Sequence, residues 1–312
     1  MTRERFVKRV VISGATGAIG IALIQLLIEH GVYTVVLCHS ESFRNDRIPE
    51  DPLVRKVNCS LEQMEEYQVD ETEPFDIFFH LAWAGTSGIA RNDMYLQNKN
   101  VKYALDAVNL AHRFGCKKFV GVGSQAEYGR HCHTLAEDTP TVPENGYGIA
   151  KLCAGRMTAI LADQLGMEHN WVRVLSVYGP FDGENTLVMS VIRQLLSGNS
   201  PKVTACQQIW DFLYCTDAAT ALFLVAEKGV NCKVYVLGGG EERPLSEYVE
   251  IIRDNVNSGG TIEYGAIPYD DKQVMYLHGN ISEIREDTGY TPKVSFEEGI
   301  RQTIQWVKGN IE

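Results

Sequence analysis

A tyrosine and a lysine four residues apart could carry out proton transfer in this chain. They are Tyr147 and Lys151 in the segment YGIAK, which begins a predicted helix over residues 147–165. Residues at this spacing lie on one face of a helix, so the phenol and the ammonium group would be neighbours. A free tyrosine titrates near pH ~10, and a nearby cation stabilises its phenolate and lowers that pKa. The pair could therefore act as an acid or a base near neutral pH, unless it is only a surface helix pair.

Ser124 could orient a substrate oxygen beside Tyr147. It ends the apolar stretch of residues 118–124, which we predict to be a β-strand. A hydroxyl at a strand end can hydrogen-bond a carbonyl or hydroxyl oxygen. The alternative is that Ser124 only fixes the turn that follows the strand.

A glycine-rich segment near the N-terminus has the features of a phosphate-binding loop. Gly14, Gly17 and Gly20 follow a predicted strand at residues 10–12 and open a predicted helix that Gly31 ends. Glycines let the backbone turn tightly and approach a pyrophosphate, while a helix N-terminus offers N–H groups and the positive end of its dipole. Such a pattern can also mark only close helix–sheet packing. The strand before it and the helix after it favour a dinucleotide site.

The end of the predicted second strand, residues 34–38, bears on which dinucleotide binds. NAD sites place Asp or Glu there, about 20 residues after the glycine loop. Here the strand is followed by His39 and Ser40, and the nearest acid, Glu41, lies beyond the strand end. His39, Ser40 and Arg44 could instead receive a 2′-phosphate. We therefore expect NADP rather than NAD, with NAD as the alternative if Arg44 is only a solvated loop residue.

The composition is that of an ordinary globular protein. Of 312 residues, 45% are hydrophobic and 22% charged, which excludes a disordered or fibrous chain. A net charge of −11 disfavours binding to nucleic acid or to an anionic membrane. No apolar run reaches the roughly 18 residues of a membrane span, and glycines and polar residues interrupt the stretch that superficially resembles a signal peptide. We expect a cytoplasmic protein.

The eight cysteines include no CxxC pair, and we interpret them as reduced thiols. The segment His131-Cys132-His133 could hold a metal, but no second group of ligands stands at zinc-finger spacing. We expect a polar loop there and no metal site.

Apolar strands alternate with amphipathic helices through the first 240 residues. Further strands are predicted at residues 54–57, 75–82, 171–175, 212–215 and 234–237, and a long helix at 93–114. This alternation predicts an α/β fold, a Rossmann-type doubly wound parallel sheet, with a smaller C-terminal α/β cap that binds substrate. We place a dinucleotide-binding domain at residues 1–175, with the strands near 212 and 234 returning to its sheet. Residues 176–312 would mainly form the substrate-binding domain.

These motifs together resemble the extended short-chain dehydrogenase/reductase family, and within it the NAD-dependent epimerases, dehydratases and reductases of nucleotide-linked sugars. The resemblance covers nearly the whole chain. It includes the stretches 80–82 (HLA), 172–180 (VRVLSVYGP), 210–214 (WDFLY) and 289–292 (GYTP), as well as Asn100 in the long helix.

The resemblance implies roles for the matching residues. Tyr147 is the acid/base, Lys151 lowers its pKa and holds the nicotinamide ribose, and Ser124 orients the substrate oxygen. Asn100 would hold the helix backbone or a water behind the lysine. The motifs and the resemblance together give these cofactor-binding residues: Gly14, Thr16, Gly17, Ala18, Ile19, Gly20, His39, Ser40, Arg44, Asn58, Cys59, Ser60, Leu81, Ala82, Ala84, Asn100, Val122, Tyr147 and Lys151. Relatives often carry an Asp near the adenine in place of residues 58–60.

Two departures from the family pattern narrow the reaction. Sugar 4,6-dehydratases carry an Asp-Glu pair where this chain has Gln125 and Ala126, so we do not expect a dehydratase; Glu127 is out of register and would face the loop. Many relatives carry a phosphate-binding arginine where Trp210 stands. Trp210 would stack on a base or sugar, or only pack against Phe212. The expected substrate-binding residues are Ser124, Gln125, Asn185 and Trp210.

Stretches 178–185 and 265–276 resemble reductases that act on nucleotide-linked 4-keto-6-deoxy sugars. We therefore expect hydride transfer at C4 of such a sugar, with a nucleotide-sugar 4-epimerase holding NAD as the alternative. A cofactor-binding sensor without turnover is a third possibility, which the retained Tyr147 and Lys151 disfavour. An epimerase recycles its own cofactor, so an NADP site would favour the reductase. Relatives often pair the helices equivalent to 93–114 and 147–165 across a two-fold axis, which implies a homodimer.

Overall fold

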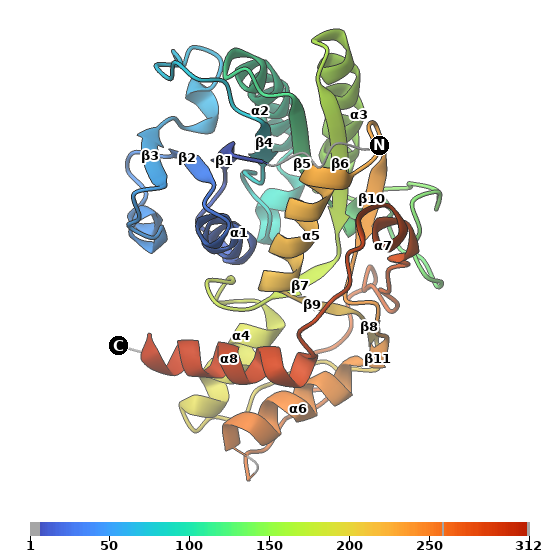
Figure 1. The fold of residues 1–312 in the computed structure, drawn as a ribbon. Helices are drawn as coiled ribbons and strands as arrows, with labels where there is room; N and C mark the ends of the chain where they lie inside the picture. Colours follow the sequence, from blue (N-terminus) through green and yellow to red (C-terminus); the bar gives the residue numbers. More distant parts are fainter. Residues whose placement is uncertain (1–6, 258, 311–312) are drawn as a thin grey trace.

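A seven-stranded parallel sheet forms the centre of the protein. The computed structural model describes residues 7–257 and 259–310 (Figure 1). The strand order is β10-β6-β5-β4-β1-β2-β3, and every neighbouring pair is parallel. The bounds are β1 (Arg9–Ser13), β2 (Tyr33–Cys38), β3 (Val54–Asn58), β4 (Ile77–His80), β5 (Lys118–Ser124), β6 (Glu168–Val174) and β10 (Val234–Leu237). The chain changes direction of winding between β1 and β4, where such sheets open a crevice for ligands. The predicted Rossmann-type sheet is confirmed.

Helices cover both faces of this sheet (Figure 1). Helices α1 (Ala18–Glu29) and α5 (Cys215–Lys228) pack together on one face, and α2 (Met94–Arg113) and α3 (Gly146–Gln164) on the other. The all-apolar start of β4 is explained by this double cover, because a strand buried on both faces has no polar side. Asp93 begins α2 by accepting hydrogen bonds from the backbone N–H groups of Tyr95 and Leu96, and Asn145 begins α3 in the same way through Gly148.

The C-terminal part forms a smaller body beyond the carboxyl edge of the sheet. It contains α4 (Leu187–Leu196), α6 (Leu245–Asn257) and α8 (Phe296–Gly309), whereas α7 (Ser282–Thr288) packs on α5 and β10 of the main body. Two short sheets join it to the main body, namely parallel β7 (Ser176–Tyr178) with β9 (Phe212–Tyr214), and antiparallel β8 (Ile209–Trp210) with β11 (Arg243–Pro244). The division of the chain into two domains near residue 175 stays a prediction.

One predicted strand does not lie where the sequence placed it. The strand near 234 joins the main sheet as β10, but the strand near 212 does not return to it. β10 already occupies the free edge of β6. β9 therefore pairs with β7, the continuation of the chain after β6, outside the main sheet.

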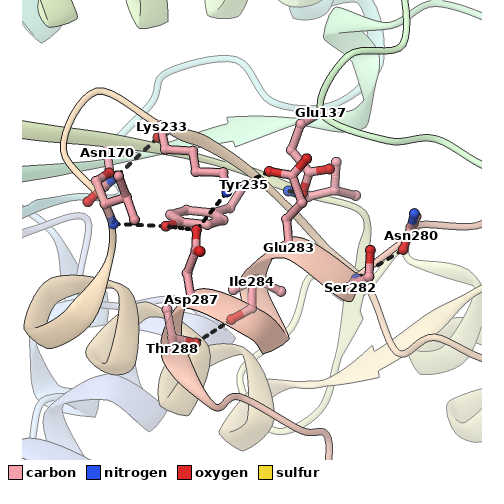
Figure 2. Close-up of polar contacts among 12 residues, drawn as sticks. Glu137, Asn170, Lys233, Tyr235, Asn280, Ser282, Glu283, Ile284, Asp287 and Thr288 are labelled. Atoms are coloured by element: carbon pink, nitrogen blue, oxygen red, sulfur yellow. Dashed lines mark hydrogen bonds and ion pairs between the residues drawn. The ribbon is translucent and has the colours of Figure 1, made fainter.

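Helix α7 covers the outer edge of β10 through a group of polar contacts (Figure 2). The Lys233 ammonium lies 2.7 Å from carboxylate oxygens of both Glu283 and Asp287. The buried Tyr235 hydroxyl donates to Asp287 at 2.8 Å and accepts from the backbone N–H of Val230 at 2.9 Å. The N–H of Val236 in β10 also donates to the Glu137 carboxylate at 3.2 Å, so the outer edge of the strand is covered by the helix and by the segment that carries Glu137 (Figure 2).

The eight cysteines are free thiols, five buried and three exposed, as expected for reduced cysteines. In the parts of the chain that the structure describes, no helix is long and apolar enough to cross a membrane. Over the same residues, no three His, Cys, Asp or Glu side chains gather to hold a metal ion. His131 instead packs edge-on against His133 and hydrogen-bonds the carbonyl of Tyr128.

Candidate active site

The structure brings Ser124, Tyr147 and Lys151 together at the carboxyl edge of the sheet. Ser124 is the last residue of β5, and the cap at Asn145 places Tyr147 and Lys151 in the first two turns of α3. All three side chains are buried. The Lys151 ammonium donates to the carbonyl of Val122 at 2.6 Å, which anchors α3 to β5. The expected catalytic residues therefore form one cluster.

Burial shifts the pKa of both titratable groups in this cluster. Burial raises the pKa of Tyr147, while its hydrogen bond with Ser124 and the charge of Arg91 act in the opposite direction. Burial lowers the pKa of Lys151 to about 7, opposed by the charge of Glu127. The ammonium lies 3.9 Å from the centre of the Trp83 ring, a cation–π contact. Lys151 is thus poised to change its charge near neutral pH.

Glu127 does not face the loop, and that expectation is wrong. It belongs to a short helix, η4 (Gln125–Glu127), and its side chain is fully buried. Its carboxylate accepts hydrogen bonds from the backbone N–H of Ser124 (2.8 Å), from Trp171 Nε1 (2.9 Å) and from Arg173 Nε (2.8 Å). Parallel pairing places Arg173 opposite Gly123, so the guanidinium reaches the end of β5. Arg173 stands between the apolar Val172 and Val174 of β6, which was the signal that a buried acid must lie nearby.

A cavity of about 300 Å³ lies over the ends of β1 and β2. Among the expected cofactor-binding residues, those that line it are Gly14, Thr16, His39, Cys59, Ser60, Ala82 and Ala84. Ser40, Arg44, Asn58 and Leu81 do not line it, nor do Ala18, Ile19 and Gly20 in the first turn of α1. Seven of the expected cofactor-binding residues thus lie around one cavity, and the assignment of the whole set stays a prediction.

The glycine loop fits a dinucleotide pyrophosphate. Gly14 has a φ of +79°, and a Cβ there would lie 2.3 Å from the backbone nitrogen of Ala82. Gly17 caps α1 without any side-chain hydrogen bond to the free N–H groups of the helix. A Cβ on Gly17 would meet no protein atom within 4 Å. Free N–H groups beside open space are what a phosphate group requires.

Asn100 acts on a different backbone segment from the one expected. Its side-chain amide donates to the carbonyl of Ala84 at 2.9 Å and accepts from the N–H of the same residue at 3.0 Å. This double contact fixes the loop after β4, which also carries Trp83. The backbone that Asn100 holds is thus that of the loop rather than of a helix, and the expected water behind Lys151 stays a prediction.

A second arginine near the glycine loop was missed from the sequence. Arg47 ends the short helix η1 (Phe43–Arg47), and its guanidinium donates to the carbonyl of Thr16 at 3.4 Å. Burial and the charge of Arg44 lower the pKa of Arg47, while the charge of Glu184 acts in the opposite direction. In the described part of the chain, no carboxylate comes within ion-pair distance of either arginine. The sequence itself contains the signal that could have identified Arg47, because it follows Arg44 by only three residues.

The expected substrate residues line two cavities on the other side of the cluster. Asn185 and Trp210 line one of about 470 Å³, and Gln125 lines one of about 200 Å³. The Trp210 ring also packs near Phe212, and its Nε1 donates to Ser176 at 2.8 Å. The two alternatives weighed for Trp210 are thus compatible.

The segment that resembles sugar reductases contributes to both of these cavities. Gln273 and Ile267 line the larger one, and Lys272 and Val274 line the smaller one. Residues 265–276 therefore contribute side chains to both cavities, and their contact with a substrate stays a prediction.

Comparison with known proteins identifies the class of protein that this fold and site define. The model of the NAD dependent epimerase/dehydratase family matches residues 10–238, and the chain belongs to that family. A curated relative, a putative UDP-glucose 4-epimerase of Methanocaldococcus jannaschii, is 23% identical over 308 residues, which cover 96% of this chain and 99% of the relative.

Solved structures share the whole fold. The UDP-N-acetylglucosamine 4-epimerase of Methanobrevibacter ruminantium, in complex with UDP-N-acetylmuramic acid, superposes with a TM-score of 0.87 at 23% identity, covering 98% of this chain and 99% of that one. The structure of RMD from Pseudomonas aeruginosa complexed with NADPH gives 0.82 at 18% identity, covering 97% of this chain and 100% of that one. The enzymes of this fold thus include proteins solved with a nucleotide-linked sugar and with a reduced dinucleotide.

Gly17→Ala tests the dinucleotide site without disturbing the free protein. The φ of Gly17 is −96° and the space around its Cβ position is open, so alanine should fold normally. The new methyl group would occupy the space expected for the pyrophosphate. We expect the dissociation constant for NADP⁺, measured by calorimetry, to rise at least about tenfold, equivalent to ~1.4 kcal/mol.

Gly309→Ala is the matched control, because its Cβ would also meet no atom within 4 Å but lies at the end of α8. Equal NADP⁺ affinity in the Gly17 variant and the wild-type protein would contradict the assigned site.

Proposed function

We propose that this protein is an oxidoreductase that transfers a hydride at C4 of a nucleotide-linked sugar, with Tyr147 as the proton donor and acceptor. The observation that carries the proposal is the buried cluster of Ser124, Tyr147 and Lys151 beside Gln125 and Ala126. The cluster can move a proton at a hydroxyl or carbonyl oxygen. Gln125 and Ala126 stand where a dehydratase carries its two acids. The nearby Glu127 does not replace them, because it is bound to Arg173.

Each residue of the cluster has a separate role at the reacting oxygen. The bound dinucleotide supplies or accepts the hydride. Ser124 hydrogen-bonds the sugar oxygen and Tyr147 gives it a proton during reduction, or takes one during oxidation. Lys151 holds the nicotinamide ribose and places positive charge behind the phenol. Burial of all three excludes water from the site, which strengthens each of these electrostatic interactions.

We propose a 4-keto-6-deoxy sugar as the substrate class. Residues 265–276 resemble those of reductases for such sugars, and they line both cavities beside the catalytic cluster. The larger cavity, with Asn185 and Trp210, would hold the nucleotide.

The cofactor that we propose is NADP. The nearest acid after β2, Glu41, lies beyond the strand end, although Glu62 also lines the cavity. Arg47 contacts the glycine loop through the carbonyl of Thr16, and Arg44 stands three residues before Arg47. Two guanidinium groups can form charge-assisted hydrogen bonds with the 2′-phosphate of NADP. The 2′-hydroxyl of NAD carries no charge with which they could pair.

A 4-epimerase that retains NAD is the second candidate. It would use the same three residues, first oxidising C4 and then reducing the opposite face of the keto sugar. Several similar proteins carry 4-epimerase in their names, which supports this reading.

A single assay separates these candidates. The full-length protein is denatured to identify any released dinucleotide, and the native protein is incubated with NADPH or NADH and a panel of nucleotide-linked 4-keto-6-deoxy sugars. We expect stoichiometric consumption of NADPH. Tyr147→Phe should lower turnover by about 10²–10⁴-fold, because it removes the proton donor but keeps the ring.

Other results of this assay would change the proposal. Tightly bound NAD, no net consumption and interconversion of C4 epimers would establish the epimerase. Full turnover by the Tyr147→Phe variant would refute the assigned mechanism.

Arg47→Gln should change the cofactor preference. The variant loses a charged donor near the 2′ position, so its dissociation constant for NADP⁺ should rise about tenfold or more while that for NAD⁺ stays within about twofold. Both constants can be measured by calorimetry. Arg301→Gln on the exposed face of α8 is the charge-matched control. A parallel loss of NADP⁺ and NAD⁺ affinity would contradict the 2′-phosphate assignment.

We also propose a homodimer formed by α2 and α3, which lie side by side (Figure 1). On α3, Ile149 and Ile160 are 53% and 62% exposed, with Met157 also exposed on the same face. Apolar side chains aligned over three turns of a helix usually mark a contact surface. Light scattering at micromolar concentration should give twice the 34.8 kDa chain mass.

Ile160→Glu should shift the homodimer toward the monomer. Val230→Glu, an equally apolar and exposed residue outside α2 and α3, should not. A monomeric mass for the wild-type protein would refute the homodimer.

A further inference from the structure

Arg91 lies against the catalytic tyrosine, on a segment that the family motifs do not include. It belongs to the short helix η3 (Gly88–Asn92), between β4 and α2. Its guanidinium carbon is 4.4 Å from the centre of the Tyr147 ring, within the range of a cation–π contact. One guanidinium nitrogen donates to the carbonyl of Thr86 at 3.0 Å, which holds the group in place over the ring.

Lys151 lies farther from the Tyr147 ring than Arg91 does, and its positive charge is less constant with pH. Its ammonium lies 5.9 Å from the centre of the Tyr147 ring and is directed at the carbonyl of Val122 and at the Trp83 ring. Burial brings its pKa to about 7, so part of the population is neutral at physiological pH. An arginine keeps its charge throughout this range. Among the described residues, Arg91 is therefore the permanent cation in contact with the phenol ring.

The charge of Arg91 is also available to act on the tyrosine. Over the described residues, no carboxylate lies within ion-pair distance of it, whereas Arg130, which lines the same cavity of about 200 Å³, is paired with Glu144. The groups that act on Tyr147 are Arg91 from η3, Ser124 from β5 and Glu127 from η4, with Lys151 on its own helix. Arg91 and Ser124 favour the phenolate, and Glu127 opposes it.

We propose that Arg91 is a positioning residue for the reaction, which holds the Tyr147 ring and stabilises the phenolate formed when the tyrosine gives up its proton. This inference rests on the proposed role of Tyr147. During reduction the O–H bond of Tyr147 breaks, the proton goes to the sugar oxygen and the electron pair stays on the phenolate. The hydride comes from the reduced dinucleotide. In the reverse direction the phenolate takes the proton of the sugar hydroxyl, so the same guanidinium favours the reactive form of the base.

The titration of Tyr147 tests this proposal without a sugar substrate. The full chain is labelled with tyrosine carrying ¹³C at Cζ and saturated with NADP⁺, and the resonance missing from Tyr147→Phe is assigned to Tyr147. We expect Arg91→Gln to move the onset of its titration upward by about one pH unit, the effect of one nearby charge. Arg91→Lys should restore most of the wild-type behaviour. Lys99→Gln, which removes an exposed positive charge from α2, should leave the onset unchanged.

The outcomes separate this proposal from the proposed function. An onset that is unchanged in Arg91→Gln, or equally raised in Lys99→Gln, would overturn the role of Arg91 even if the enzyme reduces a nucleotide-linked sugar. A raised onset with no turnover on any sugar of the panel would support the contact but overturn the reaction. Where turnover is found, the pH profile for oxidation of the sugar should shift upward in Arg91→Gln by the same amount as the resonance.

Discussion

The buried ion pair between Glu127 and Arg173 is the interaction on which the catalytic end of the sheet depends. Two charges enclosed in the protein lose their hydration, and each remains there only because the other is present. Removing one partner of such a pair typically costs about 3–5 kcal/mol. The Glu127 carboxylate also accepts hydrogen bonds from the backbone N–H of Ser124 and from the indole N–H of Trp171. The charge pair therefore fixes the backbone of Ser124, whose hydroxyl we propose to meet the substrate, and links β5 to β6 at their carboxyl ends.

The surroundings of Lys151 follow from the same arrangement. Its ammonium lies among the rings of Trp83, Trp171 and Tyr147, with the Val122 carbonyl as its hydrogen-bond acceptor. Aromatic rings offer a cation only weak compensation for lost water, which explains the lowered pKa of this lysine. A buried carboxylate at Glu127 offsets part of that loss. Two cations thus lie near the phenol of Tyr147. Lys151 can change its charge near neutral pH, whereas the charge of Arg91 is permanent.

The sequence predicted the features that depend on local pattern. Strand–helix alternation gave the parallel sheet, and the spacing of Tyr147 and Lys151 gave their common helix face. The pairing of β9 with β7 could not be read in this way, because it depends on β10 occupying the edge of β6. The partners of Glu127 were hidden for a similar reason. Arg173 reaches it through the register of two strands that lie far apart in the chain, and no local pattern encodes that register.

The contacts between α7 and β10 bear on how the protein is made. β10 is complete at residue 237, while the helix that covers its edge begins only at Ser282. During synthesis this edge of the sheet would therefore lack the cover of the helix until the last part of the chain emerges, although the N–H of Val236 can already pair with Glu137. Open edges of this kind pair readily with other chains, so a nascent or truncated protein would be prone to aggregation. The contacts of Lys233 and Tyr235 with Asp287 form only when that last region is present, so helix α7 contributes to covering the central sheet.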